Sequence, residues 1–218
     1  MKKFDLAVFD LDGTLIDSQL DLSHAVNAML AQLGRPPLDL ATIASYVGNG
    51  APVLMRRALG PEATEDEVAV ALDYFIRYYH QHRTVHTRLY ENAESSLRRL
   101  HEHGVKLAVL TNKPVRISQA ILADLGVDDL FFQVYGGNSL PEKKPHPMGL
   151  YKLLEESSTT NQRAIMVGDS AVDVRTAKNA AVFALGVTFG FQPDTFAADP
   201  PDALIHHMDE LPGVVLGQ

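Results

Sequence analysis

The sequence predicts an α/β fold: a Rossmann-like three-layer core with a mostly parallel sheet, into which an all-helical domain is inserted. Three short apolar runs rich in β-forming residues each end directly in polar residues. The runs do not alternate apolar and polar side chains, which is typical of parallel strands covered by helices on both faces. The stretch between the first two runs has helical patterns throughout. It is too long for a simple crossover, so it predicts a separate helical unit.

The predicted strands cover residues 4–9, 107–110 and 164–167, with a weaker one at 131–135. Asp10 follows the first strand, Thr111 follows the second, and Asp169 follows the third after one glycine. In open α/β sheets the functional residues gather at the carboxyl ends of the strands. We therefore expect these polar residues to lie together and to form the functional site.

The inserted stretch predicts four helices. The first begins at a cap formed by Asp17 or Ser18 and ends before Gly34. The fourth begins at Thr64, which has capping-box spacing to Glu67. The other predicted helices cover residues 39–47 and 51–59, and the fourth extends to residue 81. We expect a helical domain over residues 17–83 and an α/β core over residues 1–16 and 84–218.

Composition narrows the class of protein. The 218 residues are 46% hydrophobic and 21% charged, which is ordinary for a folded globular chain. Acidic residues outnumber Lys and Arg by 27 to 19 and no basic run occurs, so we expect no nucleic-acid partner. No apolar stretch approaches the roughly 18 residues of a membrane span, and there is no cysteine. These features predict a cytoplasmic protein without a membrane partner. The expected assembly is a monomer or a homodimer.

The first strand ends in the motif Asp10-Leu11-Asp12-Gly13-Thr14. Two carboxylates one residue apart repel each other unless a cation lies between them, and a hard metal ion suits carboxylate oxygens. Taken by itself, the same motif also fits a polar turn or a fragment of a calcium loop. The strand before it favours the metal site.

Two further motifs could bind phosphate. Thr111-Asn112-Lys113 offers a hydroxyl and exposed backbone N–H groups, although it equally fits a strand-to-helix cap. Lys143 and Lys144 open the run KKPHP, in which a lysine could neutralise phosphate charge or simply lie in a solvated loop. Neither motif by itself is strong evidence for a phosphate-binding site.

The third strand leads into VGDSAVD, where Asp169 and Asp173 can face one point or form an ordinary helix N-terminus. Together FDLDGTLIDS, TNKP, KKPHP and VGDSAVD resemble the four motifs of the haloacid dehalogenase superfamily of phosphohydrolases. The helical stretch lies where that family carries its cap domain of the first type. Within the family, VGNG at residues 47–50, the run 56–60 and RLY at residues 88–90 resemble bacterial phosphoglycolate phosphatases, although Glu91 replaces a proline common there.

The resemblance implies a role for each acidic residue. Asp10 is expected to be the nucleophile that forms an aspartyl phosphate, and Asp12 the general acid and base. Mg²⁺ is expected on Asp10, Asp169 and the backbone carbonyl of Asp12. Asp173 is expected to lie outside these ligands and to orient Lys144 or metal-bound water.

The resemblance also implies the phosphate ligands, with Lys144 as a catalytic cation because it directly precedes a proline. The expected phosphate-binding groups are Thr111, Asn112, Lys144 and the N–H groups of Leu11 and Asp12. Asn49 in the helical domain is expected to contact substrate. The roles of Arg56, Arg57 and His146 stay open, and Tyr74, Tyr78 and Tyr79 are expected to be packing residues.

The implied function is an Mg²⁺-dependent phosphomonoesterase for a small phosphorylated metabolite, with 2-phosphoglycolate, hydrolysed to glycolate and phosphate, as the first candidate. A sugar phosphomutase of the β-phosphoglucomutase type, a phosphatase for another small phosphate or pyrophosphate, and a non-catalytic binding module remain alternatives. A hydrolytic dehalogenase is disfavoured, because that chemistry needs no metal and does not keep the second aspartate.

Overall fold

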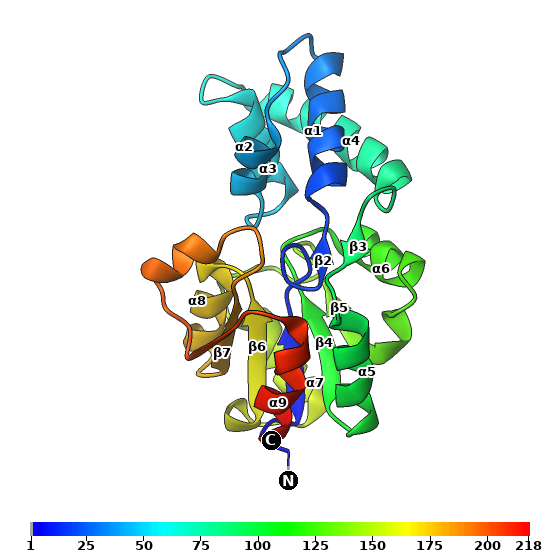
Figure 1. The fold of residues 1–218 in the computed structure, drawn as a ribbon. Coiled ribbons are helices and arrows are strands. Elements are labelled where there is room, and N and C mark those ends of the chain that lie inside the picture. The colour runs from blue at the N-terminus through cyan, green and yellow to red at the C-terminus, as the bar shows by residue number, and fades with distance from the viewer. Residues whose placement is uncertain (1) are drawn as a thin grey trace.

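The computed structural model describes residues 2–218, and its centre is one six-stranded sheet in the order β5-β4-β1-β6-β7-β8 (Figure 1). Every neighbouring pair is parallel. The strands are β1 (Leu6–Phe9), β4 (Lys106–Leu110), β5 (Phe131–Tyr135), β6 (Ala164–Gly168), β7 (Phe183–Val187) and β8 (Ala203–Ile205). The predicted fold class and all four predicted strands are confirmed. β7 and β8 were not predicted.

Helices cover both faces of this sheet, which explains the unbroken apolar strands. Alternate residues of β1 belong to different apolar clusters, with Ala7 and Phe9 on one face and Leu6 and Val8 on the other. The first face packs against α5 (Ala93–Glu102), α6 (Val115–Asp124) and α9 (Leu211–Leu216), and the second against α7 (Met148–Ser157) and α8 (Ala171–Asn179). Short 3-10 turns connect elements at Asp128–Leu130, Asn161–Arg163, Pro193–Ala197 and Met208–Glu210.

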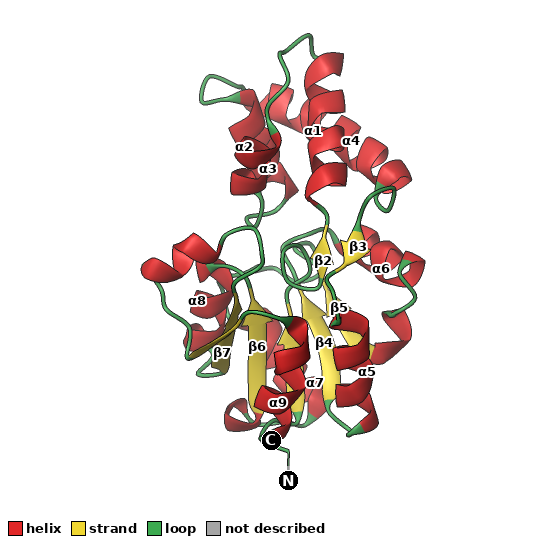
Figure 2. Cartoon of the chain, in the orientation of Figure 1, coloured by secondary structure: helices red, strands yellow, loops and turns green. Residues whose placement is uncertain are grey.

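Four helices pack together beyond the carboxyl edge of the sheet (Figure 2). They are α1 (Gln19–Gln32), α2 (Leu40–Tyr46), α3 (Ala51–Leu59) and α4 (Glu65–His82), close to the predicted ranges. The capping box at Thr64 and Glu67 is formed in both directions. The chain enters this helical segment through β2 (Ile16–Asp17) and leaves it through β3 (Arg88–Leu89), and these two strands form a small antiparallel ribbon.

α1 begins directly after Ser18, as predicted, but the Ser18 hydroxyl does not cap it. Ser18 occupies the N-cap position, but its hydroxyl makes no bond to the helix. It donates instead to the Asp12 carboxylate at 2.5 Å, while the Asp17 carboxylate accepts from the N–H of Gln19 at 3.2 Å. The entry to the helical segment is therefore tied to the first motif.

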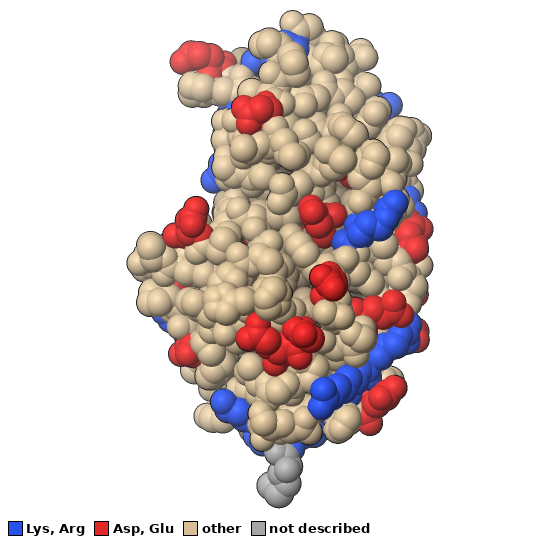
Figure 3. Space-filling model, in the orientation of Figure 1, with Lys and Arg blue, Asp and Glu red and all other residues tan. Residues whose placement is uncertain are grey.

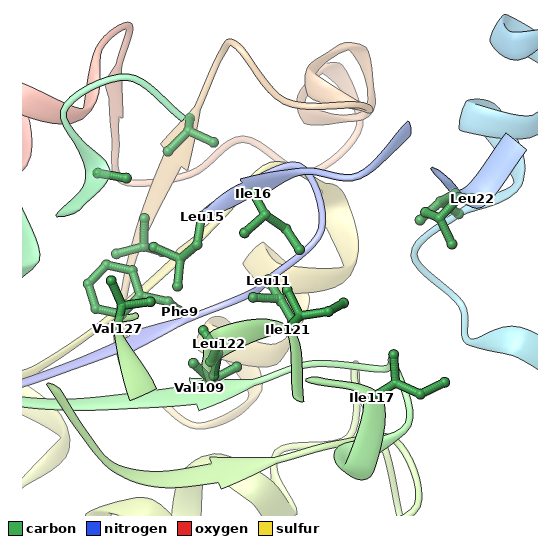
Figure 4. Packing of buried hydrophobic residues seen from close by; sticks show 14 of the residues in the cluster. Phe9, Leu11, Leu15, Ile16, Leu22, Val109, Ile117, Ile121, Leu122 and Val127 are labelled. Carbon is green, nitrogen blue, oxygen red and sulfur yellow. The ribbon is translucent and has the colours of Figure 1, made fainter. Parts of the chain in front are cut away.

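Apolar side chains anchor the loop that carries Asp10 and Asp12. Leu11, Leu15 and Ile16 are fully buried, and Figure 4 shows them in the same apolar cluster as Phe9 and Ile121. Burying three such side chains contributes several kcal/mol to holding this loop, at about 1.5–3 kcal/mol for each side chain. The two carboxylates consequently flank a fixed, buried leucine.

The outer surface is mixed in charge. On the face shown in Figure 3, acidic and basic side chains are interspersed, without the continuous basic surface that a nucleic-acid backbone requires. None of the helices within residues 2–218 combines the length and apolarity needed to cross a membrane.

Candidate active site

Three buried carboxylates meet at the carboxyl edge of the sheet. Asp10 follows β1, Asp169 follows β6, and Asp173 lies in the first turn of α8. One oxygen from each lies within 4.8 Å of the others. Parallel strands bring residues about 160 positions apart to one edge, as the sequence led us to expect.

Lys144 is the cation of this cluster. Its ammonium lies 2.9 Å from Asp10 Oδ1 and 2.6 Å from Asp173 Oδ1, and its side chain is only 1% exposed. Asp173 uses its second oxygen to accept from the hydroxyl and N–H of Ser170, so it also caps α8. Lys143 points elsewhere, to the backbone carbonyl of Asn49 at 2.8 Å.

The cluster holds more negative charge than Lys144 neutralises. Burial, together with the charge of Asp173, raises the pKa of Asp10 from its ordinary 3.8 to about 6, against the opposing effect of Lys144. Burial and the neighbouring carboxylates also raise the pKa of Asp169 well above its usual range. Carboxylates in such a cluster are stabilised by a further cation.

The donor set fits a hard divalent ion. Asp10 Oδ1 is buried and accepts no hydrogen bond of good geometry from any described residue, although the Lys144 ammonium is near it. Asp169 is held by its Oδ2, which accepts from the N–H of Phe191 at 2.7 Å. Carboxylate oxygens at this spacing are the ligands that Mg²⁺ prefers.

Gly13 is required beside this cluster. Its φ of +80° lies in the left-handed region, and a Cβ there would collide with the Asp169 carboxylate. The glycine of the first motif therefore lets the Asp10 loop approach Asp169.

Asp12 faces away from the three-carboxylate cluster and has its own partners. The ammonium of Lys113 lies 2.8 and 2.9 Å from its two carboxylate oxygens, in addition to the Ser18 hydroxyl. Lys113 also donates to the hydroxyl of Tyr79 at 2.8 Å. Burial raises the pKa of Tyr79 to about 12, so its hydroxyl stays protonated at neutral pH.

Lys113, Ser18 and Tyr79 were missed as site residues. Lys113 belongs to the motif Thr111-Asn112-Lys113, so the sequence already pointed to this segment as part of a site. Tyr79 was expected to be a packing residue, and its ring does pack in the core at 1% exposure. Only its hydroxyl reaches the site, and a helical pattern cannot reveal that contact.

The residues expected to bind phosphate are partly engaged elsewhere. The Thr111 hydroxyl accepts from the N–H of Lys113 at 3.2 Å. The Asn112 amide donates to the carbonyls of Gly48 at 2.9 Å and Lys144 at 3.0 Å. Asn112 thus connects the α2–α3 loop to the core, and its buried Oδ1 has no partner among the described residues.

Other residues with open roles lie away from the cluster. Arg56 pairs with Glu65 and donates to the carbonyl of Ala63, while Arg57 donates to the carbonyl of Tyr46. His146 is exposed, and its Nδ1 accepts from the N–H of Met148 at 3.2 Å. These contacts give the three residues structural partners.

The arrangement of strand ends, lysine and carboxylates has a counterpart among known proteins. A family model described as haloacid dehalogenase-like hydrolase matches residues 7–187. The chain belongs to this family.

Named relatives of this haloacid dehalogenase-like chain include phosphoglycolate phosphatases. The one from Vibrio cholerae is 38% identical over 99% of both chains, and the one from Haemophilus influenzae is 41% identical over 87% of this chain and 88% of its own. The crystal structure of a predicted phosphoglycolate phosphatase from Haemophilus somnus has a TM-score of 0.91 at 36% identity, covering 97% of each chain. The family and the fold expected from the motifs are confirmed.

A cavity of about 40 Å³ lies between the helical segment and the hydrolase core, next to Asp10 and Asp12. Its helical side is mostly apolar, and its core side combines polar residues with Pro114 and Ile117. The lining includes Leu22, Leu54, Phe75, Tyr79, Thr111 and Lys113. We call this arrangement, in which the helical segment is seated on the core beside the cavity, the closed form.

Loop residues hold this closed form. Gln192, which follows β7, donates to the carbonyls of Val47 at 2.8 Å and Ser45 at 3.1 Å. With Asn112 on Gly48 and Lys143 on Asn49, three core side chains bind consecutive parts of the segment that ends at Gly50. We refer to Asn112, Lys143 and Gln192 as the latch residues.

Proposed function

We propose that the protein is an Mg²⁺-dependent phosphomonoesterase that hydrolyses 2-phosphoglycolate, or a closely related small phosphate ester, through an aspartyl phosphate on Asp10. The observation that carries the proposal is the buried Asp10 carboxylate, whose Oδ1 lies 2.9 Å from the Lys144 ammonium and close to two further carboxylates. Mg²⁺ and the aspartyl-phosphate mechanism are general to the family to which the chain belongs. Relatives named phosphoglycolate phosphatase across nearly the whole chain support the choice of substrate.

In the proposed reaction, Asp10 attacks phosphorus and the bond to the leaving oxygen breaks. Asp12 gives its proton to that oxygen, and later takes a proton from the water that attacks the aspartyl phosphate. The water's oxygen leaves as part of inorganic phosphate, and Asp10 returns as a carboxylate. Both steps transfer one phosphoryl group, so stabilising its negative charge is the main task of the remaining residues.

Lys144 supplies a fixed positive charge next to Asp10, and Asp173 holds that ammonium in place. Asp10, Asp169 and the backbone carbonyl of Asp12 would hold Mg²⁺, which would neutralise phosphoryl charge when bound. Thr111 and the N–H groups of Leu11 and Asp12 complete the proposed phosphate ligands. The Asn112 amide donates to the carbonyls of Gly48 and Lys144, so it can join them only after it releases one of the two.

Residues 17–83 form the proposed cap, and residues 1–16 with 84–218 form the proposed catalytic core. The cavity lies between these two parts, so movement of the cap relative to the core would control access of substrate to Asp10. Asn49 is the proposed cap residue that contacts the substrate from the α2–α3 loop, where Lys143 donates to its carbonyl at 2.8 Å. Closure excludes water from the aspartyl phosphate until hydrolysis.

Gln192, one of the latch residues, offers a direct test of the cap's role. Replacing Gln192 with Ala removes hydrogen bonds to two cap carbonyls, so we expect kcat/KM to fall about 3- to 10-fold, as losing roughly 1 kcal/mol of hydrogen bonding implies. The melting temperature is expected to change little. Steady-state kinetics and thermal unfolding measure both. Gln162→Ala, an exposed glutamine before β6, is the matched control. Wild-type kinetics in Gln192→Ala would show that closure does not use this contact.

Metal binding has a readout apart from activity. Adding Mg²⁺ to protein stripped with a chelator is expected to raise its melting temperature, because the ion binds only the folded cluster. Asp169→Asn removes one proposed ligand and is expected to abolish most of that rise. An equal rise in both proteins would place the ion elsewhere.

The function itself is tested by measuring phosphate release from 2-phosphoglycolate and other small esters, with Mg²⁺ and with chelator. Selective and metal-dependent release from 2-phosphoglycolate is expected. An isomerised sugar phosphate without free phosphate would favour a phosphomutase. Release from other esters alone would keep the mechanism and exclude the proposed substrate.

A further inference from the structure

Lys113 is a buried cation that the proposed reaction has not yet used. Its side chain is 4% exposed and its three ammonium protons have three acceptors: the two oxygens of Asp12 and the hydroxyl of Tyr79. A lysine is rarely buried unless it is paired. Its pairing partner here is the proposed general acid and base rather than a structural carboxylate.

Tyr79 adds a second attachment. The ammonium of Lys113 lies 4.5 Å from the centroid of the Tyr79 ring as well as 2.8 Å from its hydroxyl. The ring stacks on Phe75 of the same helix at 5.5 Å between centroids. Tyr79 therefore fixes where the ammonium lies.

We propose that Lys113, held by Tyr79, is a positioning residue that aims the Asp12 carboxylate at the leaving oxygen. The inference rests on the proposed role of Asp12 in proton transfer. Lys113 keeps its own protons throughout. When Asp12 carries the proton to be donated, only its other oxygen can accept from Lys113, so the ammonium orients the protonated oxygen toward the substrate.

The contact also couples Asp12 to the cap. Lys113 lies in the loop after β4, and Tyr79 lies on α4 of the proposed cap. Their bond forms only when α4 sits on the core, so Asp12 is aimed when the cap is closed. Proton transfer is thereby restricted to the closed form, in which water is excluded.

A different role for Lys113 predicts different kinetics. Among the described residues that line the cavity, Lys113 is the one lysine or arginine, so it could instead bind the carboxylate of 2-phosphoglycolate. That role would show mainly in KM and only for substrates that carry a second anionic group. A positioning role shows mainly in kcat and for every ester that needs a proton on its leaving oxygen.

The test compares Tyr79→Phe, Lys113→Met and the double variant. Small displacements of a catalytic group can cost on the order of 100-fold in rate. We expect kcat to fall about 10-fold in Tyr79→Phe and about 100-fold in Lys113→Met, with KM within about twofold of wild type. Because Tyr79 acts through Lys113, the double variant is expected to be no slower than Lys113→Met. Tyr78→Phe, on the same helix, is the matched control.

Three substrates separate the roles: 2-phosphoglycolate, ethyl phosphate and p-nitrophenyl phosphate. The loss of kcat in Lys113→Met is expected to be larger for the two alkyl esters than for the aryl ester, whose leaving group needs little protonation. A rise in KM confined to 2-phosphoglycolate would overturn the proposal in favour of carboxylate binding. An equal loss of kcat on all three esters, with additive effects in the double variant, would show that Lys113 and Tyr79 have only a structural role.

Wild-type activity distinguishes this inference from the proposed function. If the wild type releases no phosphate, the proposed function fails before any variant is compared. If the wild type is active and Tyr79→Phe matches it, only the present inference fails. Tyr79→Phe keeps the ring and loses one oxygen, so it tests the contact even where Lys113→Met does not fold.

Discussion

Replacing Asp10 with Asn is expected to reduce phosphate release by about four orders of magnitude or more, because it removes the nucleophile on which both chemical steps depend. The fold is expected to survive. Asp10 lies beside two other buried carboxylates, so the uncharged amide relieves repulsion, while Lys144 keeps Asp173 as its partner. Single-turnover kinetics and thermal unfolding measure the two effects.

Asp17→Asn is the control for Asp10→Asn, because it removes an exposed carboxylate from neighbouring β2. It is expected to behave like wild type. Residual turnover of Asp10→Asn within 100-fold of wild type would show that another group attacks phosphorus.

Replacing Lys144 with Met is expected to have the second largest effect, on both activity and stability. The variant leaves Asp10 and Asp173 buried without their cation, and removing one partner of a buried charge pair costs about 3–5 kcal/mol. Turnover is expected to fall with the loss of positive charge beside the transferred phosphoryl group. Urea unfolding of the metal-free protein measures the stability loss, and Lys178→Met, at an exposed position in the last turn of α8, is the control.

The stability loss of Lys144→Met is expected to shrink as the pH falls. In the wild type, the pKa of Asp10 is already raised from 3.8 to about 6 in the folded state, so the folded protein binds more protons than the unfolded chain between these values. Stability from this group therefore falls as the pH rises through that window. Without Lys144, the pKa of Asp10 in the folded state rises further, because the attraction of the ammonium is lost. The pH range over which stability falls then extends to higher pH, so the variant loses more stability than the wild type as the pH rises. A pH-independent difference between variant and wild type would contradict the charge-cluster explanation.

Local signals explain why most of the fold was predictable. Thr64 with Glu67 and the stop at Gly34 mark helix ends through backbone chemistry that acts within one turn. The buried strands β1, β4 and β6 are unbroken apolar runs because both sheet faces are covered. β8 has only three residues and β7 contains Gly186, so neither gave a comparable pattern.

The site also has residues that the sequence could predict and contacts that it could not. Asp10, Thr111 and Asp169 were predicted to meet because each directly follows a parallel strand, and topology alone brings strand ends together. The contact between Tyr79 and Lys113 depends on how α4 is rotated and seated against the core. Nothing within the sequence around Tyr79 specifies that geometry, and its burial matches an ordinary core position. The hydrogen bond from the Asn112 amide to the carbonyl of Gly48 was not predicted either, because it also depends on how the helical segment sits on the core.

The central claim, that Asp10 accepts the phosphoryl group, is tested most directly by trapping the intermediate. Wild-type protein mixed with 2-phosphoglycolate and Mg²⁺ is quenched in acid within one turnover, digested and analysed by mass spectrometry. We expect one added phosphoryl group on the peptide that contains Asp10, and none in Asp10→Asn. Phosphate release at the wild-type rate with the phosphoryl group on another residue, or with Asp10→Asn equally active, would contradict it.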